Sequence, residues 1–433
     1  MDVIQTDKRV DSASFDAETM NTLADSARRA ARALAGFTSK EKEAILRSWA
    51  DALDRNESSI IQSNREDLEA ASEEGHPPAV LDRLTLDAKR VAEVAADVRH
   101  VASLDDPVGA VIEGRTLPNG LRLEKVRVPL GVIGVIYEGR PNVTVDAAAL
   151  AIKSGNAVLL RGSRIAERSN ACLVSILQEA GEQAGLPGGS VQGLTPTRDA
   201  ANWLMRARGT VDLLIPRGGA DLIQTVVQKS QVPVVETGVG NCHVYIDAHA
   251  DLEKALPILI NAKTQRPGVC NAAETFLVHR DVAAVFVPQA LGALAESGVE
   301  VFGDPELQRL APEQVRVRPV TEEDYRAEFL DLKIAGRVVD SIDEAIDHIA
   351  TYGSAHTDAI VSEDYEAIRR FVDRVDSAAV IVNASTRFTD GGEFGMGAEI
   401  GISTQKLHAR GPMALPELTT YKFVVYGSGQ IRT

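Results

Sequence analysis

Three cysteines are the side chains of this sequence best suited to covalent chemistry. Cys172 lies among apolar residues with helical spacing, which favours a buried structural thiol. Cys242 begins an expected strand, and we interpret it as structural too. Cys270 differs because it lies in a loop, 264–271, that contains proline and glycine between an expected helix and an expected strand. Catalytic groups are common in such loops, so a nucleophile and an ordinary turn cysteine are both open interpretations of Cys270.

Positive charge close to Cys270 would favour the reactive form of its thiol. Lys263 and Arg266 lie a few positions before it. A nearby cation lowers the pKa of a thiol, and the thiolate is the nucleophile. We therefore expect both side chains to influence Cys270.

A second set of residues could bind a phosphorylated cofactor. Arg161, Ser163 and Arg164 follow an expected strand, and guanidinium groups bind phosphate through paired hydrogen bonds. A site for the 2′-phosphate of a dinucleotide and a solvated arginine pair at a helix start both fit this pattern. Gly218 and Gly219 form a later strand-to-helix turn that could cradle phosphate. The sequence has no G-x-G-x-x-G after its first strand, so the usual dinucleotide fingerprint is absent.

The first hundred residues have the spacing of helices. Residues 38–41 match a capping box, and apolar residues then recur at Ile45, Trp49 and Leu53. The segment 111–127 alternates like a strand on both sides of a Pro-Asn-Gly turn, so we expect a hairpin there.

Strands alternate with helices from residue 132 onward. The first run has expected strands at 132–137, 157–160, 211–215 and 232–235, and expected helices at 143–154, 165–185 and 221–230. The second run has expected strands at 243–247, 275–279, 333–339, 358–362 and 379–382, and expected helices at 252–265, from 281, at 343–350 and at 365–375. A strand at 419–426 follows a glycine-rich loop, 391–401. This alternation predicts parallel βαβ units and two doubly wound α/β domains.

Length, charge and composition exclude several classes of protein. A chain of 433 residues predicts two or three domains. Its net charge of −16 opposes binding to a phosphate backbone, so we expect no nucleic-acid partner. We also expect no membrane span, because no apolar run is long enough. The first residues have no hydrophobic signal segment, and three cysteines suit a reducing compartment, so we expect a cytoplasmic protein.

Several phrases of the sequence resemble the aldehyde dehydrogenase superfamily. Gly268-Val269-Cys270 is similar to its catalytic-cysteine loop, and Glu236 precedes Cys270 by 34 positions, which is the separation of that superfamily's motif glutamate. The segment 151–163 resembles the strand that enters the cofactor site. The γ-glutamyl phosphate reductase branch is more similar still, through phrases in the expected order at 135–144, 215–219, 236–243, 265–272 and 401–412.

The resemblance implies an aldehyde dehydrogenase-like α/β fold. We expect the N-terminal helices and a cofactor-binding domain at 1–236, a catalytic domain at 237–405, and a return segment with an oligomerisation strand at 406–433. The hairpin 111–127 and the strand 419–426 would form a small oligomerisation flap. We therefore expect a homo-oligomer.

The resemblance also implies an activity. It predicts NADPH-dependent reduction of γ-glutamyl phosphate to glutamate 5-semialdehyde in proline biosynthesis, through a thioester on Cys270. NADP would be the oxidised cofactor, and no metal is expected. A glutamate 5-kinase is the partner protein that such a pathway suggests.

Further roles follow from the resemblance, residue by residue. Oxidising relatives place an oxyanion-binding asparagine where this sequence has Gly139 or Arg140, so Asn142 and the N–H of Cys270 become the candidate donors. Glu236 is either a catalytic residue or a salt-bridged or capping glutamate. Substrate anions would be bound by four residues: Arg266 for the phosphate, and Ser403, His408 and Arg410 for the amino-acid end.

Two rival interpretations remain open for the sequence. One is an NAD(P)-dependent aldehyde dehydrogenase that oxidises an aldehyde to the acid, which Arg161, Arg164 and the missing asparagine oppose. The other is a relative without catalytic activity that binds or scaffolds, or a partner subunit in a kinase–reductase complex. Retention of Cys270 with its whole loop opposes it.

Overall fold

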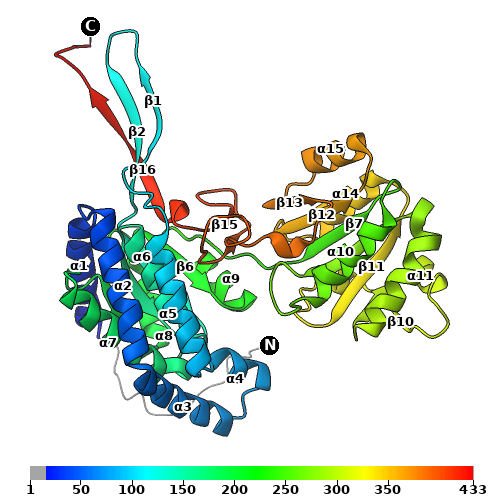
Figure 1. The fold of residues 1–433 in the computed structure, drawn as a ribbon, viewed down its shortest axis with the longest axis horizontal. Coiled ribbons are helices and arrows are strands. Elements are labelled where there is room, and N and C mark those ends of the chain that lie inside the picture. The colour runs from blue at the N-terminus through cyan, green and yellow to red at the C-terminus, as the bar shows by residue number, and fades with distance from the viewer. Residues whose placement is uncertain (1–15, 433) are drawn as a thin grey trace. The chain divides into compact units, whose positions relative to one another are not determined.

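The chain folds into two compact units. The computed structural model describes residues 16–432 (Figure 1). One unit contains the chain up to Val234 and again from Leu418, and the other contains Val235–Glu417. The expected boundary at residue 236 lies close to the first of these divisions. The chain returns at Leu418 rather than at Lys406, so the expected catalytic domain ended too early.

The first unit begins with five helices. They are α1 (Ala17–Leu34), α2 (Ser39–Arg55), α3 (Glu57–Glu73), α4 (Pro78–Leu84) and α5 (Ala88–Ser103). The expected capping box at the start of α2 is confirmed: the Thr38 hydroxyl accepts from the Glu41 N–H, and the Glu41 carboxylate accepts from the Thr38 N–H. The apolar stripe Ile45, Trp49 and Leu53 is fully buried, which is how α2 is fixed to the rest of the unit.

A four-stranded parallel sheet forms the centre of the first unit. Its order is β5-β4-β3-β6, with β3 (Val132–Tyr137), β4 (Ala157–Arg161), β5 (Val191–Gly193) and β6 (Leu213–Arg217). Its helices are α6 (Asn142–Lys153), α7 (Glu167–Gln183), α8 (Arg198–Arg206) and α9 (Ala220–Lys229), with a 3₁₀ turn, η1 (Arg164–Ala166), before α7. β5 and α8 were not predicted. The strand expected at 232–235 is wrong, because only Val234 forms an isolated bridge, to Leu214.

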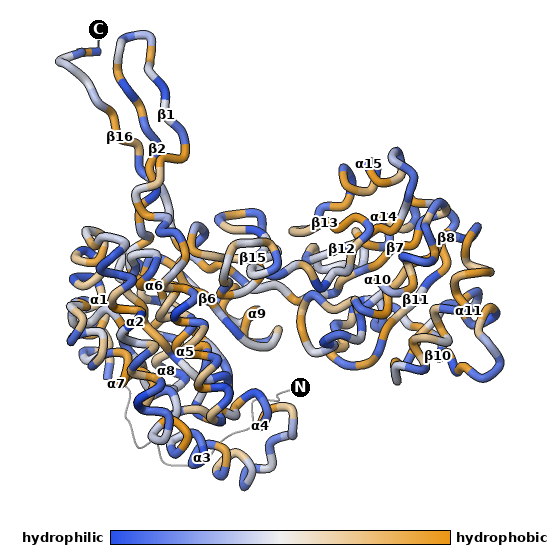
Figure 2. Tube along the Cα trace, viewed as in Figure 1, coloured by the Kyte–Doolittle hydropathy of each residue, from blue (hydrophilic) through white to orange (hydrophobic). Residues whose placement is uncertain are grey.

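Three antiparallel strands form the flap. β2 (Arg122–Pro129) lies between β1 (Val111–Thr116) and β16 (Thr419–Tyr426). The predicted hairpin and C-terminal strand are therefore confirmed. Hydrophobic and hydrophilic residues are mixed along these strands (Figure 2), and Tyr421, Phe423 and Val425 are about half exposed on β16.

A seven-stranded parallel sheet forms the second unit, in the order β10-β9-β11-β8-β7-β12-β13. Its strands are β7 (Cys242–Ile246), β8 (Ala273–His279), β9 (Glu300–Gly303), β10 (Val317–Pro319), β11 (Lys333–Val339), β12 (Thr357–Val361) and β13 (Ala379–Val382). Its helices are α10 (Leu252–Thr264), α11 (Arg280–Glu296), α12 (Pro305–Arg309), α13 (Glu322–Arg326), α14 (Ile342–Tyr352) and α15 (Tyr365–Arg374). A small two-stranded sheet, β14 (Ile402–Ser403) and β15 (Gly411–Pro412), lies near its end.

Both faces of the larger sheet are covered, as parallel sheets require. Phe276 and Phe286 belong to the apolar cluster on one face, and Leu277 and Phe371 to the cluster on the other. Successive residues of β8 thus point into different cores, which explains why the strand is a continuous apolar run. The doubly wound fold predicted for this half is confirmed, and β8 is the rigid element that follows the Cys270 loop.

Candidate active site

The Cys270 loop is held in place through its backbone. It connects α10 to β8, and the Cys270 side chain is partly exposed. A Cβ atom added to Gly240 would lie 1.6 Å from the carbonyl oxygen of Cys270, so only glycine allows this approach. The buried thiol of Cys242 donates a hydrogen bond to that same carbonyl oxygen, at 3.2 Å. The backbone that carries the Cys270 thiol is therefore fixed.

The two neighbouring cysteines have different environments. Burial raises the pKa of the Cys242 thiol, and the charge of Asp358 adds to this effect. Cys242 therefore stays an S–H donor at neutral pH. Among the residues described, none of the three cysteines forms a disulfide.

Lys263 does not supply the positive charge that we expected near Cys270. Its ammonium group is fully buried and forms an ion pair with Glu274 at 2.6 Å. Burial lowers the pKa of Lys263 and raises that of Glu274, and their mutual attraction opposes both shifts. Glu274 balances the charge of Lys263. The expected influence of Lys263 on the Cys270 thiol is therefore corrected.

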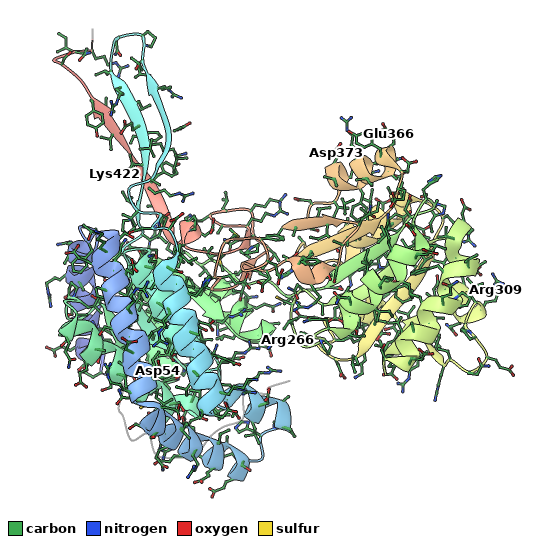
Figure 3. The ribbon with its side chains drawn as sticks, in the orientation of Figure 1. Asp54, Arg266, Arg309, Glu366, Asp373 and Lys422 are labelled. Carbon is green, nitrogen blue, oxygen red and sulfur yellow. The ribbon has the colours of Figure 1, made fainter. Side chains whose placement is uncertain are left out.

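Positive charge reaches this loop from a part of the chain that sequence reasoning missed. Arg387 lies in the 3₁₀ turn Thr386–Phe388 that follows β13. Its Nε donates to the Oε1 of Gln265 at 2.8 Å. Burial lowers the pKa of Arg387, and the charge of Arg266 lowers it further, while Arg266 itself is exposed (Figure 3). The signal in the sequence was the position of Arg387 just after a strand end.

Two further segments of the second unit pack beside the Cys270 loop. The segment 236–241 contains Gly240, which contacts Cys270, and Gly238, whose N–H donates to the Ile402 carbonyl at 2.9 Å. The Glu236 N–H donates to Gln405 Oε1 at 2.7 Å. The candidate residue Glu236 is thus tied to the 402–405 segment and lies four residues before the glycine that touches Cys270.

The three candidates for the amino-acid end have different environments. Ser403 is fully buried on β14, and its hydroxyl accepts from the Gln405 N–H at 3.3 Å. His408 is exposed and shares a hydrogen bond with the Glu417 carbonyl at 2.8 Å. Arg410 forms an ion pair with Asp376 at 2.8 Å. An anion at Arg410 would therefore compete with Asp376.

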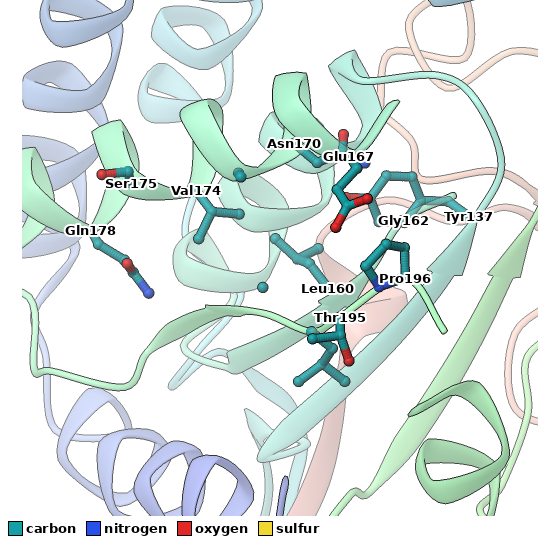
Figure 4. A pocket seen from close by; sticks show the side chains of 13 residues that line it. Tyr137, Leu160, Gly162, Glu167, Asn170, Val174, Ser175, Gln178, Thr195 and Pro196 are labelled. Carbon is teal, nitrogen blue, oxygen red and sulfur yellow. The ribbon is translucent and has the colours of Figure 1, made fainter. Parts of the chain in front are cut away.

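A pocket of about 340 Å³ lies in the first unit, beside β4 and α7 (Figure 4). Tyr137, Gly162 and Asn170 line it. The Tyr137 and Thr144 hydroxyls share a hydrogen bond at 2.7 Å, and Thr144 donates to Asn170 at 2.9 Å. A Cβ atom on Gly162 would lie 2.2 Å from the Asn170 amide nitrogen, so glycine is required here too. The volume of this pocket is within the usual range for a small-molecule site.

The residues expected to bind cofactor surround the end of β4. The Arg161 guanidinium donates to the carbonyls of Pro196 and Thr197, both at 3.0 Å. Among the described residues, its buried Nε has no hydrogen-bond partner. Ser163 precedes the 3₁₀ turn η1, and Arg164 is exposed on it.

The Gly218–Gly219 turn already holds an anion from the protein. The Glu138 carboxylate accepts from the Gly219 N–H at 2.8 Å, and it would overlap with any side chain on Gly218. Nearby on α6, the Asn142 amide donates to Asp146 at 2.9 Å. Burial raises the pKa of Asp146 to about 7, and the charge of Asp97 adds to the shift.

Comparison with known proteins identifies the family. The model of the aldehyde dehydrogenase family matches residues 4–331. The chain belongs to the aldehyde dehydrogenase family. Enzymes of this family use NAD or NADP and act on small molecules as oligomers.

Three proteins similar to this aldehyde dehydrogenase match it over nearly its whole length. It is 57% identical to the γ-glutamyl phosphate reductase of Thermobifida fusca over 95% of this chain and 98% of that protein. It is 57% identical to that of Carboxydothermus hydrogenoformans, over 96% and 99%. The crystal structure of γ-glutamyl phosphate reductase from Thermotoga maritima matches with a TM-score of 0.93 and 48% identity, over 96% of this chain and all of that one.

The family and its fold confirm the resemblance inferred from sequence. Within the second unit of this aldehyde dehydrogenase, Cys270 and Arg266 share one loop, and the segment that begins at Glu236 reaches it through Gly240. The individual roles of these residues stay predictions. Across the described part of the chain, no cluster of side chains suits a metal ion, and no helix has the length and apolar character needed to cross a membrane.

Proposed function

We propose that this chain reduces L-glutamyl 5-phosphate to L-glutamate 5-semialdehyde and phosphate with NADPH, the second step of proline biosynthesis from glutamate. The observation that carries this proposal is the Cys270 loop, which contains Arg266 and whose backbone is fixed by Gly240 and Cys242. Relatives at 57% identity, matched over nearly their whole length, bear the name of this activity.

The first chemical step forms a thioester. The Cys270 thiolate attacks the γ-carbonyl carbon, a C–S bond forms, and the C–O bond to phosphate breaks with phosphate as the leaving group. Arg266 binds that phosphate. Reduction of the thioester then gives a thiohemiacetal, which releases the aldehyde and restores the Cys270 thiol.

An oxyanion develops on the substrate carbonyl in both steps, so hydrogen-bond donors must be directed at it. Our two alternative candidates for this role are the N–H of Cys270 and the side-chain amide of Asn142. The hydrogen bond from Asn142 to Asp146 uses one of its two amide protons, which leaves the other for the substrate.

Arg161, Ser163 and Arg164 would hold the cofactor. The buried Nε of Arg161 and the pocket that begins at Gly162 fit a phosphorylated nucleotide. NADPH supplies the hydride when it is bound. Arginine at both 161 and 164 favours the 2′-phosphate of NADPH over the hydroxyl of NADH. Binding of phosphate at Gly218 and Gly219 would require Glu138 to move away.

The amino-acid end of the substrate needs polar partners. Ser403, His408 and Arg410 are our candidates, of which Arg410 would exchange Asp376 for the substrate carboxylate. Glu236 is either a base or a tether through its N–H bond to Gln405. A reductase must keep water from its thioester, which favours the second role.

The molecule would work in the cytoplasm as a homo-oligomer. Three cysteines without a disulfide in the described residues fit a reducing compartment. An acyl phosphate hydrolyses readily, so a glutamate 5-kinase that supplies it is the partner protein we propose.

Substitution of the nucleophile tests this function. Cys270→Ala should abolish NADP reduction with glutamate 5-semialdehyde and phosphate, because no thioester can form. NADPH binding, followed by fluorescence titration, should survive. Cys172→Ala is the matched control, since Cys172 lies on α7 of the first unit and not in the Cys270 loop. Substantial turnover by the Cys270→Ala protein would reject the mechanism.

A further inference from the structure

We propose that Arg387 is a second phosphate-binding arginine, which together with Arg266 receives the leaving phosphate at Cys270. This inference rests on the proposed function and adds a specificity-determining residue to it. Arg387 lies far from Cys270 in sequence, in the turn after β13.

The turn that carries Arg387 is attached to both ends of the Cys270 loop. At one end the Arg387 Nε donates to Gln265, the residue before Arg266. At the other end the buried Asn271 amide donates to the Thr389 carbonyl at 2.9 Å and to the Arg387 carbonyl at 3.4 Å. The loop between these two attachments contains both Arg266 and Cys270, so Arg387 lies against it.

Asp390 attracts the charge of Arg387 without forming an ion pair with it. Among the described residues, neither the Arg266 nor the Arg387 guanidinium forms an ion pair within 4.0 Å. The nearby acid Asp390 accepts from the N–H groups of Gly392 and Glu393 through its Oδ1. Burial and the charge of Arg266 both lower the pKa of Arg387. Two like charges close together, one of them partly buried, are stabilised when an anion binds between them.

The orientation of Arg387 suits a phosphate. The Nε–H of Arg387 donates to Gln265 Oε1, and this hydrogen bond fixes the plane of the guanidinium group. The terminal amino groups are then available for paired hydrogen bonds to phosphate oxygens. Two arginines on the leaving phosphate would speed acylation of Cys270 by the acyl phosphate. In the reverse direction they would make phosphate, rather than water, the acceptor of the acyl group.

The reverse reaction measures this site with inorganic phosphate as the probe. Arg387→Gln should raise the KM for phosphate roughly tenfold to a hundredfold, because charge-assisted hydrogen bonds are lost. The KM for NADP should stay within about twofold. Arg387→Lys should recover part of the loss, since it restores the charge without the paired geometry. Arg309→Gln is the control, because Arg309 is exposed and pairs only with Glu306 among the described residues.

Alkylation of Cys270 supplies a readout that needs no turnover. In the native enzyme, anionic iodoacetate should react faster relative to neutral iodoacetamide than it does with a free thiol, and inorganic phosphate should slow iodoacetate. Arg387→Gln should lower the iodoacetate-to-iodoacetamide rate ratio roughly tenfold and remove the protection by phosphate. A merely structural Arg387 would change both reagents equally.

The outcomes separate the two proposals. An unchanged rate ratio together with an unchanged phosphate KM in Arg387→Gln would overturn the role of Arg387, even if the native enzyme depends on phosphate. Turnover of the native enzyme without phosphate would instead reject the proposed function. If Arg387→Gln does not fold, which circular dichroism would show, Arg387→Lys carries the same comparison.

Discussion

The residues around Cys270 hold the backbone of this candidate nucleophile in place. The Cys242 thiol, which burial keeps protonated, donates to the Cys270 carbonyl, and Gly240 leaves room for that carbonyl. The charge of Lys263 is balanced by its ion pair with Glu274. Arg266 in the loop and Arg387, which donates to Gln265 of the loop, carry the remaining positive charge, and we propose that both bind the leaving phosphate.

The proposed preference for NADPH belongs to the same scale, because it rests on the two arginines at the end of β4. Arg164 is exposed on η1, so Arg164→Glu should fold normally. A carboxylate there would repel the 2′-phosphate and weaken NADPH binding by roughly tenfold or more. NADH, which has no such phosphate, should bind almost as before. Isothermal titration with both cofactors checks this, and an equal loss for the two would make Arg164 a structural residue.

Several strands of four or more residues could be predicted from the sequence, and strands of three residues could not. β11, β13 and β16 lie where we expected them, to the residue. β5 and β10 have three residues each, too few to show a period. The apolar segment 232–235 is no strand because it contains Pro233, which has no N–H to donate to a sheet ladder.

The same limit explains what was missed in the site. Cys270 could be found because its loop is a local pattern of proline, glycine and cysteine. Arg387 could not, because β13 brings it to the loop from more than a hundred residues away along the chain. The ion pair of Lys263 with Glu274 joins a helix end to a strand start, and no local pattern shows such a contact.

Packing of α5 against α6 gives a pH dependence to stability. Burial raises the pKa of Asp146 on α6 from 3.8 to about 7, and Asp97 on α5 adds to it. Because the carboxyl pKa is raised in the folded state, the contribution of Asp146 to the free energy of unfolding is fully present below pH 3.8 and is lost as the pH rises through about 7. Asp146→Asn should therefore raise the melting temperature, by an amount that grows from pH 4 to pH 7 and then levels off. Calorimetry across this range tests it; a gain that does not depend on pH would contradict the shift.

At the scale of the whole molecule, the flap exposes an apolar face that one chain does not cover. Tyr421, Phe423 and Val425 are 49%, 57% and 53% exposed and lie on one face of β16. Exposed apolar patches of this kind mark contact surfaces. Phe423→Ser should reduce the molar mass measured by light scattering to that of a smaller species. Lys422→Ser, on the opposite face (Figure 3), should leave the mass unchanged. The same mass for both variants would remove the flap from the interface.

The central claim for the whole molecule is that phosphate, not water, exchanges with the acyl group on Cys270. Run in reverse, NADP reduction by glutamate 5-semialdehyde should require added phosphate. Arsenate should replace phosphate and give free glutamate, because the acyl arsenate falls apart. The direct measurement is the initial rate of NADPH formation in buffer without either anion, then with each. We expect a negligible rate that rises with phosphate or arsenate. Brisk formation of NADPH and glutamate without them would show that water releases the acyl group, which is the opposite of the proposed mechanism.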